Sequence, residues 1–297
     1  MKFFYDTKGR LSRQIVDGST IDFAYTKYGQ LAGKYLGGRN EPDAAIEYEY
    51  SRSGKIVART ANGIRQIYEY DGRGQLLAVK ENGADVERYG YDKSGNMLRK
   101  SVRGKTTTFT FDGANQLVSS TTDGVTTKYA YDAVGRLIKE GGKVYRYGYL
   151  DKVLSVTEGE RKYAYGYHVD GQLAKADYGR GEAADTGRAG CPQPAGTEDF
   201  LWDGLALIQR GDERFVNEPH IGGGNPILSS KCVAYFNDML GTTSGAWKGK
   251  DRSKRKPNRK YSAAAVLTAF GENGSRHIFF TGKPQVEGLG HAFLLRN

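Results

Sequence analysis

The feature that most constrains this chain is a short unit that recurs about every twenty residues. Most steps between its copies are 20 or 21 residues long, and the aromatic residue that marks each copy stands at Tyr5, Tyr25, Tyr50, Tyr70, Tyr91, Phe111, Tyr131, Tyr149 and Tyr167. In all copies but one, Gly or Asn stands four residues after the aromatic and an aliphatic residue or Met stands six after it. A fixed period of this length is typical of stacked supersecondary units.

The copy from Tyr68 to Leu77 predicts how the unit folds. Its two tyrosines alternate with a glutamate, which places both rings on one face of an extended strand. Asp71 suits the first position of a turn, where its side chain can accept backbone hydrogen bonds. Gly74 supplies the left-handed residue that closes a three-residue hairpin loop with a β-bulge. This geometry predicts that Tyr70 lies opposite Leu76.

The same turn is expected in the other copies. The structural turn residues are predicted to be Asp6, Gly9, Gly29, Gly54, Asp71, Gly74, Asp92, Gly95, Asp112, Asn115, Asp132, Gly135 and Gly171. Asn115 fits this series because Asn tolerates a left-handed backbone better than most side chains. The Tyr149 copy lacks the glycine and its Leu154 arrives one residue early, which predicts an altered turn.

Glycine dipeptides mark the opposite ends of the expected strands. They are Asp17-Gly18, Asn62-Gly63, Asn82-Gly83, Arg103-Gly104, Asp123-Gly124, Gly141-Gly142 and Glu158-Gly159, each about midway between two aromatic turns. Asn-Gly and Asp-Gly pairs are the strongest short hairpin signals. The chain therefore reverses about every ten residues, which predicts an all-β antiparallel meander of roughly 18 strands.

Composition limits the remaining possibilities. No apolar run approaches the roughly 20 residues of a membrane-spanning helix, and the mean hydropathy is negative. The repeats begin at the first residues, which leaves no room for a signal peptide and suggests a piece of a longer protein. Cys191 and Cys232 make no disulfide framework or metal set; two unpaired thiols are favoured, with a disulfide left open.

The positive charge is concentrated in one segment. The chain has a net charge of +10, and the stretch 248–260 holds eight Lys or Arg residues against Asp251 alone. Like charges repel and extend, so a solvated loop is favoured over a binding surface. Only Trp247 and Tyr261 flank this stretch, which gives bases little to stack on and argues against a nucleic-acid partner.

Three segments follow from these patterns. Residues 1–178 hold the repeats, residues 179–199 read as a Gly, Ala and Pro loop or linker, and residues 200–297 continue the sheet with the basic loop 248–260. The stretch from Phe200 to Leu205 reads as a degraded copy of the repeated unit, after which the rhythm changes.

The candidate chemical groups favour a scaffold over a catalyst. The repeated aspartates Asp6, Asp71, Asp92, Asp112 and Asp132 all hold the same turn position, so a turn role explains each one whereas a catalytic pair would explain two at most. The four histidines lack metal-ligand spacing. We therefore predict no enzyme activity, no cofactor and no metal site.

The tyrosines allow two interpretations. Seven of them form ladders on one strand face, at Tyr89, Tyr91, Tyr129, Tyr131, Tyr163, Tyr165 and Tyr167. A packed face would make these rings part of the core, which is the favoured interpretation. A groove on that face would suit stacking against a sugar, so glycan binding stays open as the alternative.

The repeated Tyr-Asp-x-x-Gly-x-Leu unit resembles the YD repeats of the RHS family, which is related to teneurins and to the C component of Tc toxins. Val233 to Thr243 resembles the family's Tyr-x-x-Asp-x-Leu-Gly-Thr stretch, and Phe270-Gly271-Glu272 resembles its aromatic-Gly-Glu element. Phe280-Thr281-Gly282-Lys283 and Glu287-Gly288-Leu289 resemble the start of the RHS-associated core, although the Thr before Gly288 is missing.

The resemblance implies a long β-sheet coiled into a curved, spiralling shell, of which this chain would be an open part. In the family such a shell encloses a C-terminal toxin or effector domain, so the expected partner is that cargo and the expected location is secreted or at the cell surface. The alternative is a module that binds carbohydrate or a cell surface. The family's self-cleaving Asp-Pro motif is expected to lie beyond Asn297, so no catalytic residue is carried over.

Overall fold

The computed structural model describes residues 1–61, 63–179, 196–219, 224–240 and 242–248, with short pieces at 260–261, 267–269, 279–280, 283–284 and 286. These residues contain strands and no helix. Twenty-four strands form one sheet, in which every described pairing joins strands consecutive in the chain and is antiparallel. The prediction of an all-β antiparallel meander is therefore confirmed.

The chain divides into two units. Unit 1 comprises Met1–Tyr48 with Tyr163–Asn297, and unit 2 comprises Glu49–Lys162. β5 (Ala44–Tyr50) and β17 (Arg161–Tyr167) cross the two boundaries. Each repeat supplies two strands, so the 18th strand ends at Asp177, as the repeat count predicts.

Unit 1 contains β1 (Lys2–Tyr5), β2 (Leu11–Val16), β3 (Ser19–Tyr25), β4 (Leu31–Leu36), β18 (Leu173–Asp177), β19 (Thr197–Asp203), β20 (Ala206–Arg210), β21 (Glu213–Asn217), β22 (Pro226–Ser229), β23 (Val233–Asn237) and β24 (Thr243–Lys248). Two further pairs are separate from the large sheet: β25 (Lys260–Tyr261) with β26 (Leu267–Ala269), and β27 (Phe279–Phe280) with β28 (Lys283–Pro284). Among the described residues β1 and β24 do not pair with each other, so the sheet is open.

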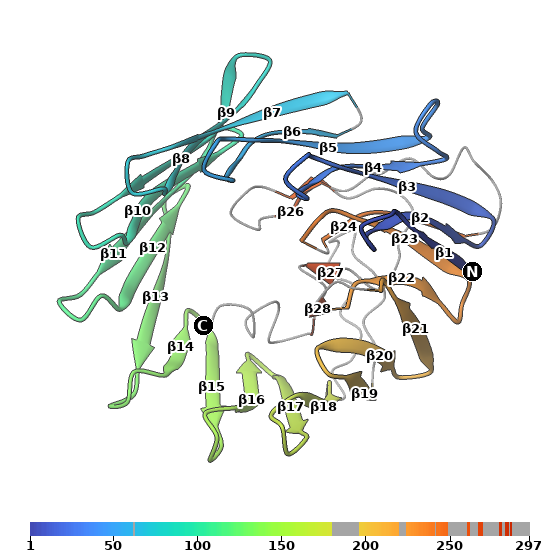
Figure 1. The fold of residues 1–297 in the computed structure, drawn as a ribbon. Coiled ribbons are helices and arrows are strands. Elements are labelled where there is room, and N and C mark those ends of the chain that lie inside the picture. The colour runs from blue at the N-terminus through green and yellow to red at the C-terminus, as the bar shows by residue number, and fades with distance from the viewer. Residues whose placement is uncertain are drawn as a thin grey trace. The chain divides into compact units, whose positions relative to one another are not determined.

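Unit 2 contains β6 (Ile56–Ala61), β7 (Ile64–Tyr70), β8 (Leu76–Glu81), β9 (Ala84–Tyr91), β10 (Met97–Val102), β11 (Lys105–Phe111), β12 (Leu117–Thr122), β13 (Val125–Tyr131), β14 (Leu137–Glu140), β15 (Lys143–Tyr147) and β16 (Val153–Glu158). These strands follow one another in chain order, from blue to green in Figure 1.

The hairpin at Asp71 shows why the repeated unit folds as it does. Tyr70 lies opposite Leu76, with a β-bulge beside the pair, as predicted. The Asp71 carboxylate accepts hydrogen bonds from the backbone N–H groups of Arg73, at 2.9 Å, and of Gln75, at 2.8 Å. Gly74 has a φ of 87° and donates its N–H to the Asp71 carbonyl at 3.0 Å. The left-handed glycine and the carboxylate together stabilise the reversal.

The remaining predicted turn residues lie in equivalent turns. Positive φ values occur at Gly9, Gly29, Gly54, Gly95, Asn115, Gly135 and Gly171. Backbone N–H groups within the turn donate to the carboxylates of Asp6, Asp92, Asp112 and Asp132. In two copies a hydroxyl replaces the carboxylate, at Thr26 and Ser51.

One part of the sequence interpretation is wrong. The copy assigned to Tyr149 is built on Tyr147, which lies opposite Val153. Asp151 occupies the left-handed position four residues after Tyr147, with a φ of 53°, and Tyr149 is 99% exposed in the turn. The repeat is therefore regular, and its spacing was misread because Asp holds the position where glycine is expected.

The core of unit 1 is the better buried of the two. Its largest buried apolar side chains are Ile21, Leu36, Ile46, Leu207, Ile227, Tyr235 and Phe236. In unit 2 the buried apolar residues are smaller or fewer, and include Ala58, Ala78, Val79, Tyr89, Tyr145 and Val156.

The expected linker, residues 179–199, is described only in part. β19 begins at Thr197, so the last three residues of this segment belong to a strand, whereas residues 180–195 lie outside the described residues.

Candidate functional site

Successive repeats are joined by hydroxyl groups of tyrosines that precede the turns. Tyr70 donates this hydroxyl to the carbonyl of Ile56 at 2.8 Å, and Tyr91 donates to the carbonyl of Leu76 at 3.0 Å. The acceptor is each time the apolar residue that follows the turn of the preceding repeat. Tyr25 bonds Leu11 and Tyr147 bonds Leu137 in the same way. A buried phenol needs such a partner, and here the partner is the neighbouring hairpin.

Other side chains take over this role toward the end of the sheet. The indole N–H of Trp202 donates to the carbonyl of Leu173 at 2.7 Å. The amide of Asn217 donates to the carbonyl of Leu207 at 2.9 Å, and that of Asn237 to the carbonyl of Pro226 at 2.7 Å. The repeated unit therefore continues to β24 without its tyrosine. The sequence signal for this last copy of the unit is the pair Asn237-Asp238. The Asp238 carboxylate accepts hydrogen bonds from two backbone N–H groups of the turn.

The tyrosine hydroxyls remain protonated over a wide pH range. Burial raises the pKa of Tyr25, Tyr70, Tyr91 and Tyr131 above the ordinary value of a phenol. A protonated hydroxyl can donate, so the bonds between repeats persist at neutral pH.

The aspartate carboxylates of the turns accept hydrogen bonds from backbone N–H groups. The backbone N–H of Arg10 is the largest cause of the lowered pKa of Asp6, and the Arg10 side chain acts in the same direction. The side-chain amide of Asn96 is the largest cause of the lowered pKa of Asp92. A catalytic acid needs a raised pKa, so these carboxyl groups suit capping and not proton donation.

The seven tyrosines proposed for glycan stacking are poorly accessible. Tyr89, Tyr163 and Tyr165 are buried, and the other four, Tyr91, Tyr129, Tyr131 and Tyr167, are half-buried. The rings that solvent reaches most are Tyr28, at 78% exposure, and Tyr149, at 99%, both in turns. Glycan stacking by the seven rings stays a prediction.

Unit 1 holds a polar interior. Lys34 Nζ lies 2.9 Å from Glu218 Oε1, and both side chains are almost completely buried. The Tyr48 hydroxyl accepts a hydrogen bond from the backbone N–H of Met239 at 2.9 Å. These two contacts join the first strands of the chain to the segment that follows β21, which sequence patterns did not reveal.

Some buried polar groups of unit 1 have no hydrogen-bond partner among the residues that the structure describes. Both amide atoms of Gln14, the hydroxyl of Ser19 and the amide nitrogen of Asn225 are buried without a hydrogen bond. Such groups carry a desolvation cost unless water or another chain satisfies them.

The described residues contain no group of three or more His, Cys, Asp or Glu side chains placed to hold a metal. No helix in the described part of the chain is long and apolar enough to cross a membrane. Cys232 is an exposed free thiol, and Cys191 lies outside the described residues. Several other predicted features also lie outside the described residues. They are most of the basic loop 248–260, the histidines His220, His277 and His291, and the motifs around Phe270 and Glu287.

Residues 55–168 match the family model described as the teneurin YD-shell. This match supports the resemblance to YD-repeat proteins over residues 55–168. Two solved structures resemble it in fold. The Photorhabdus luminescens Tc holotoxin pore aligns with a TM-score of 0.51 at 13% identity, over 96% of this chain and 19% of the other. The TcdB2–TccC3 crystal structure aligns with a TM-score of 0.53 at 14% identity, over 96% of this chain and 20% of the other.

The chain spans about a fifth of the length of the solved chains that it matches. At these identities the likeness concerns the fold. No curated protein sequence matches the chain.

Proposed function

We propose that this chain, which resembles YD-repeat proteins, forms part of the wall of a β-sheet shell that encloses a toxin or effector domain, and that the chain performs no catalysis itself. The observation that carries the proposal is the set of hydroxyl and amide bonds between successive repeats, such as Tyr70 to Ile56 and Asn237 to Pro226. They tie neighbouring hairpins together locally, so a sheet of this kind can extend by adding repeats.

The distribution of charge supports a structural role. The turn carboxylates bond their own backbone, and the buried pair of Lys34 and Glu218 neutralises itself. Asp6 and Asp92 have lowered pKa values, whereas a general acid needs a raised one.

The polar interior of unit 1 supports the idea of a cargo. Gln14, Ser19 and Asn225 offer unpartnered amide and hydroxyl groups that a polypeptide backbone could bond. The teneurin and Tc toxin resemblance favours a toxin-like cargo and a protein that acts outside the cell that makes it. Both remain parts of the proposal.

Protease protection tests the proposal in the natural protein that contains these residues. The intact protein is treated with a nonspecific protease, and the surviving peptides are identified by mass spectrometry. The same candidate cargo domain, produced alone, serves as the control. We expect the attached domain to survive far longer than the free one. Equal digestion rates for the two forms would refute enclosure.

A further inference from the structure

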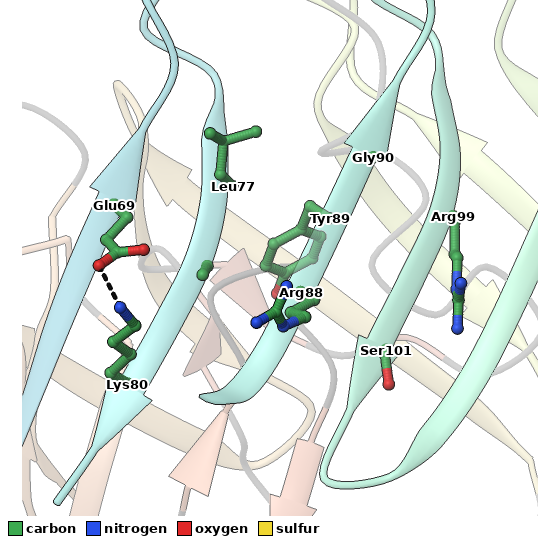
Figure 2. Close-up of a pocket in the computed structure, with 9 residues that line it drawn as sticks. Glu69, Leu77, Lys80, Arg88, Tyr89, Gly90, Arg99 and Ser101 are labelled. Atoms are coloured by element: carbon green, nitrogen blue, oxygen red, sulfur yellow. Dashed lines mark hydrogen bonds and ion pairs between the residues drawn. The ribbon is translucent and has the colours of Figure 1, made fainter. Parts of the chain in front are cut away.

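One face of unit 2 is hollowed where four strands, β7 to β10, lie side by side. The hollow has a volume of about 480 Å³ and is lined by Glu69, Leu77, Lys80, Arg88, Arg99 and Ser101, among others. Figure 2 shows the Glu69–Lys80 pair and Leu77 on one side of it and Arg99 on the other, with Arg88 between them.

The hollow exists because two neighbouring positions carry almost no side chain. Ala78 lies between Glu69 and Arg88 in the strand register. Gly90 lies opposite Arg99 on the next pair of strands. A Cβ atom added to Gly90 would approach nothing closer than 3.9 Å, so the space above this glycine is open.

Two of the three cations around the hollow form ion pairs, and the third, Arg99, does not form one with any described residue. Lys80 pairs with Glu69 at 2.5 Å, and Arg88 pairs with Asp85. Arg99 is exposed and has no carboxylate partner among the described residues. A guanidinium presents several N–H donors in a fixed fork that matches an oxyanion. The hollow therefore carries one uncompensated cation.

Two further groups complete the surface. The Ser101 hydroxyl accepts a hydrogen bond from Thr106 at 3.3 Å, so its own hydrogen can donate elsewhere. Leu77 is 40% exposed and lines the same hollow, where it offers an apolar wall. Anion donors beside an apolar wall are typical of sites for small organic anions.

We propose that this hollow binds a small organic anion whose carboxylate or phosphate is held by Arg99 and Ser101 and whose apolar part rests on Leu77. The small residues Ala78 and Gly90 in the floor give the ligand room to approach the sheet. The proposal does not depend on enclosure of a cargo, because it concerns the chemistry of this surface alone.

Titration of purified residues 1–297 tests the site. The probes are phenyl phosphate and benzoate, with phenol as the uncharged analogue, and binding is followed by calorimetry and by ligand-detected NMR. We expect saturable binding of one or both anions and at least tenfold weaker binding of phenol. The stronger of the two anions identifies the preferred oxyanion.

Three variants localise the binding. Arg99→Ala removes the free cation, and Gly90→Thr fills the floor with a residue that the next repeat carries at the same position, Thr110. Both should weaken anion binding at least tenfold. Lys139→Ala is the matched control, because Lys139 is an exposed cation opposite Ala130 at the same place in another repeat. Unchanged binding in Arg99→Ala, equal loss in Lys139→Ala or no binding by the unmodified chain would overturn the proposal.

Discussion

Lys34 on β4 and Glu218, just after β21, form a buried ion pair with 2.9 Å between Nζ and Oε1, although 184 residues separate them in the chain. The Lys34 ammonium also lies 5.0 Å from the centre of the Phe23 ring. Buried charges of this kind are stabilising only while both partners are present. The pair therefore holds two distant segments of unit 1 together.

Removal of one partner should be costly. Lys34→Met leaves the Glu218 carboxylate buried and uncompensated, which should lower the free energy of unfolding by about 3–5 kcal/mol. Urea unfolding measures the change. The double variant Lys34→Met with Glu218→Leu should recover much of the loss, since no charge is then buried alone.

The matched control for this pair is the exposed ion pair of Arg65 and Glu49, which lie 2.9 Å apart with about half of each side chain exposed. Arg65→Met should cost less than about 1 kcal/mol. Equal losses in Lys34→Met and Arg65→Met would contradict a structural role for the buried pair.

The hydroxyl bonds between repeats should be measurable one at a time. Tyr70→Phe removes the donor to the Ile56 carbonyl and should cost about 0.5–1.5 kcal/mol, since the carbonyl loses its partner. Tyr149→Phe is the control, because Tyr149 is 99% exposed and should change stability by nothing measurable. The denaturant midpoints of the two variants are compared. An unchanged midpoint in Tyr70→Phe would contradict a stabilising role for this hydrogen bond between repeats.

The left-handed turn position should resist a side chain. Gly135 has a φ of 83°, so Gly135→Ala should cost about 1–2 kcal/mol. Gly113 lies in the same kind of turn without a positive φ and with open space around it, so Gly113→Ala should be close to neutral. Thermal unfolding of both variants checks this, and equal shifts would show that the left-handed conformation does not matter.

Acid should loosen the turns. The pKa of Asp6 is lowered by the Arg10 backbone N–H, and that of Asp92 by the Asn96 amide, from an ordinary value of 3.8. A carboxyl whose folded-state pKa is lowered stabilises the fold above its unfolded pKa, and the contribution is lost as the pH falls through the folded value. The melting temperature should therefore drop as the pH falls below about 4.

A double variant isolates this effect. Asp6→Asn with Asp92→Asn keeps a side-chain carbonyl oxygen in each turn but removes the titration. Its melting temperature should depend less on pH in the acid range than that of the unmodified chain. Parallel pH curves for the two proteins would place the acid sensitivity in other groups.

Local patterns predicted most of the fold. The alternation around Tyr70, the capping role of Asp71 and the left-handed Gly74 each depend on a few neighbouring residues, so sequence alone located the hairpins and their register. The misplacement of one copy at Tyr149 had a local cause too: Asp151, and no glycine, holds the left-handed position after Tyr147.

The candidate sites were harder to predict because they depend on distant partners. No spacing rule joins Lys34 to Glu218. Alternation shows that tyrosines share a face but not that this face is buried, so the burial of Tyr163 and Tyr165 could not be read from the pattern. The hollow depends on Ala78 lying opposite Arg88, two residues from Gly90, and on Gly90 lying opposite Arg99, which requires the register of three neighbouring strands.

An electron cryomicroscopy reconstruction of the natural protein that contains these residues tests the central claim most directly. The account predicts that the hairpins of residues 1–178 lie in a continuous wall and that density for another domain lies on its inner side. A reconstruction in which the same hairpins surround no space, or in which every other domain lies outside the wall, would contradict it.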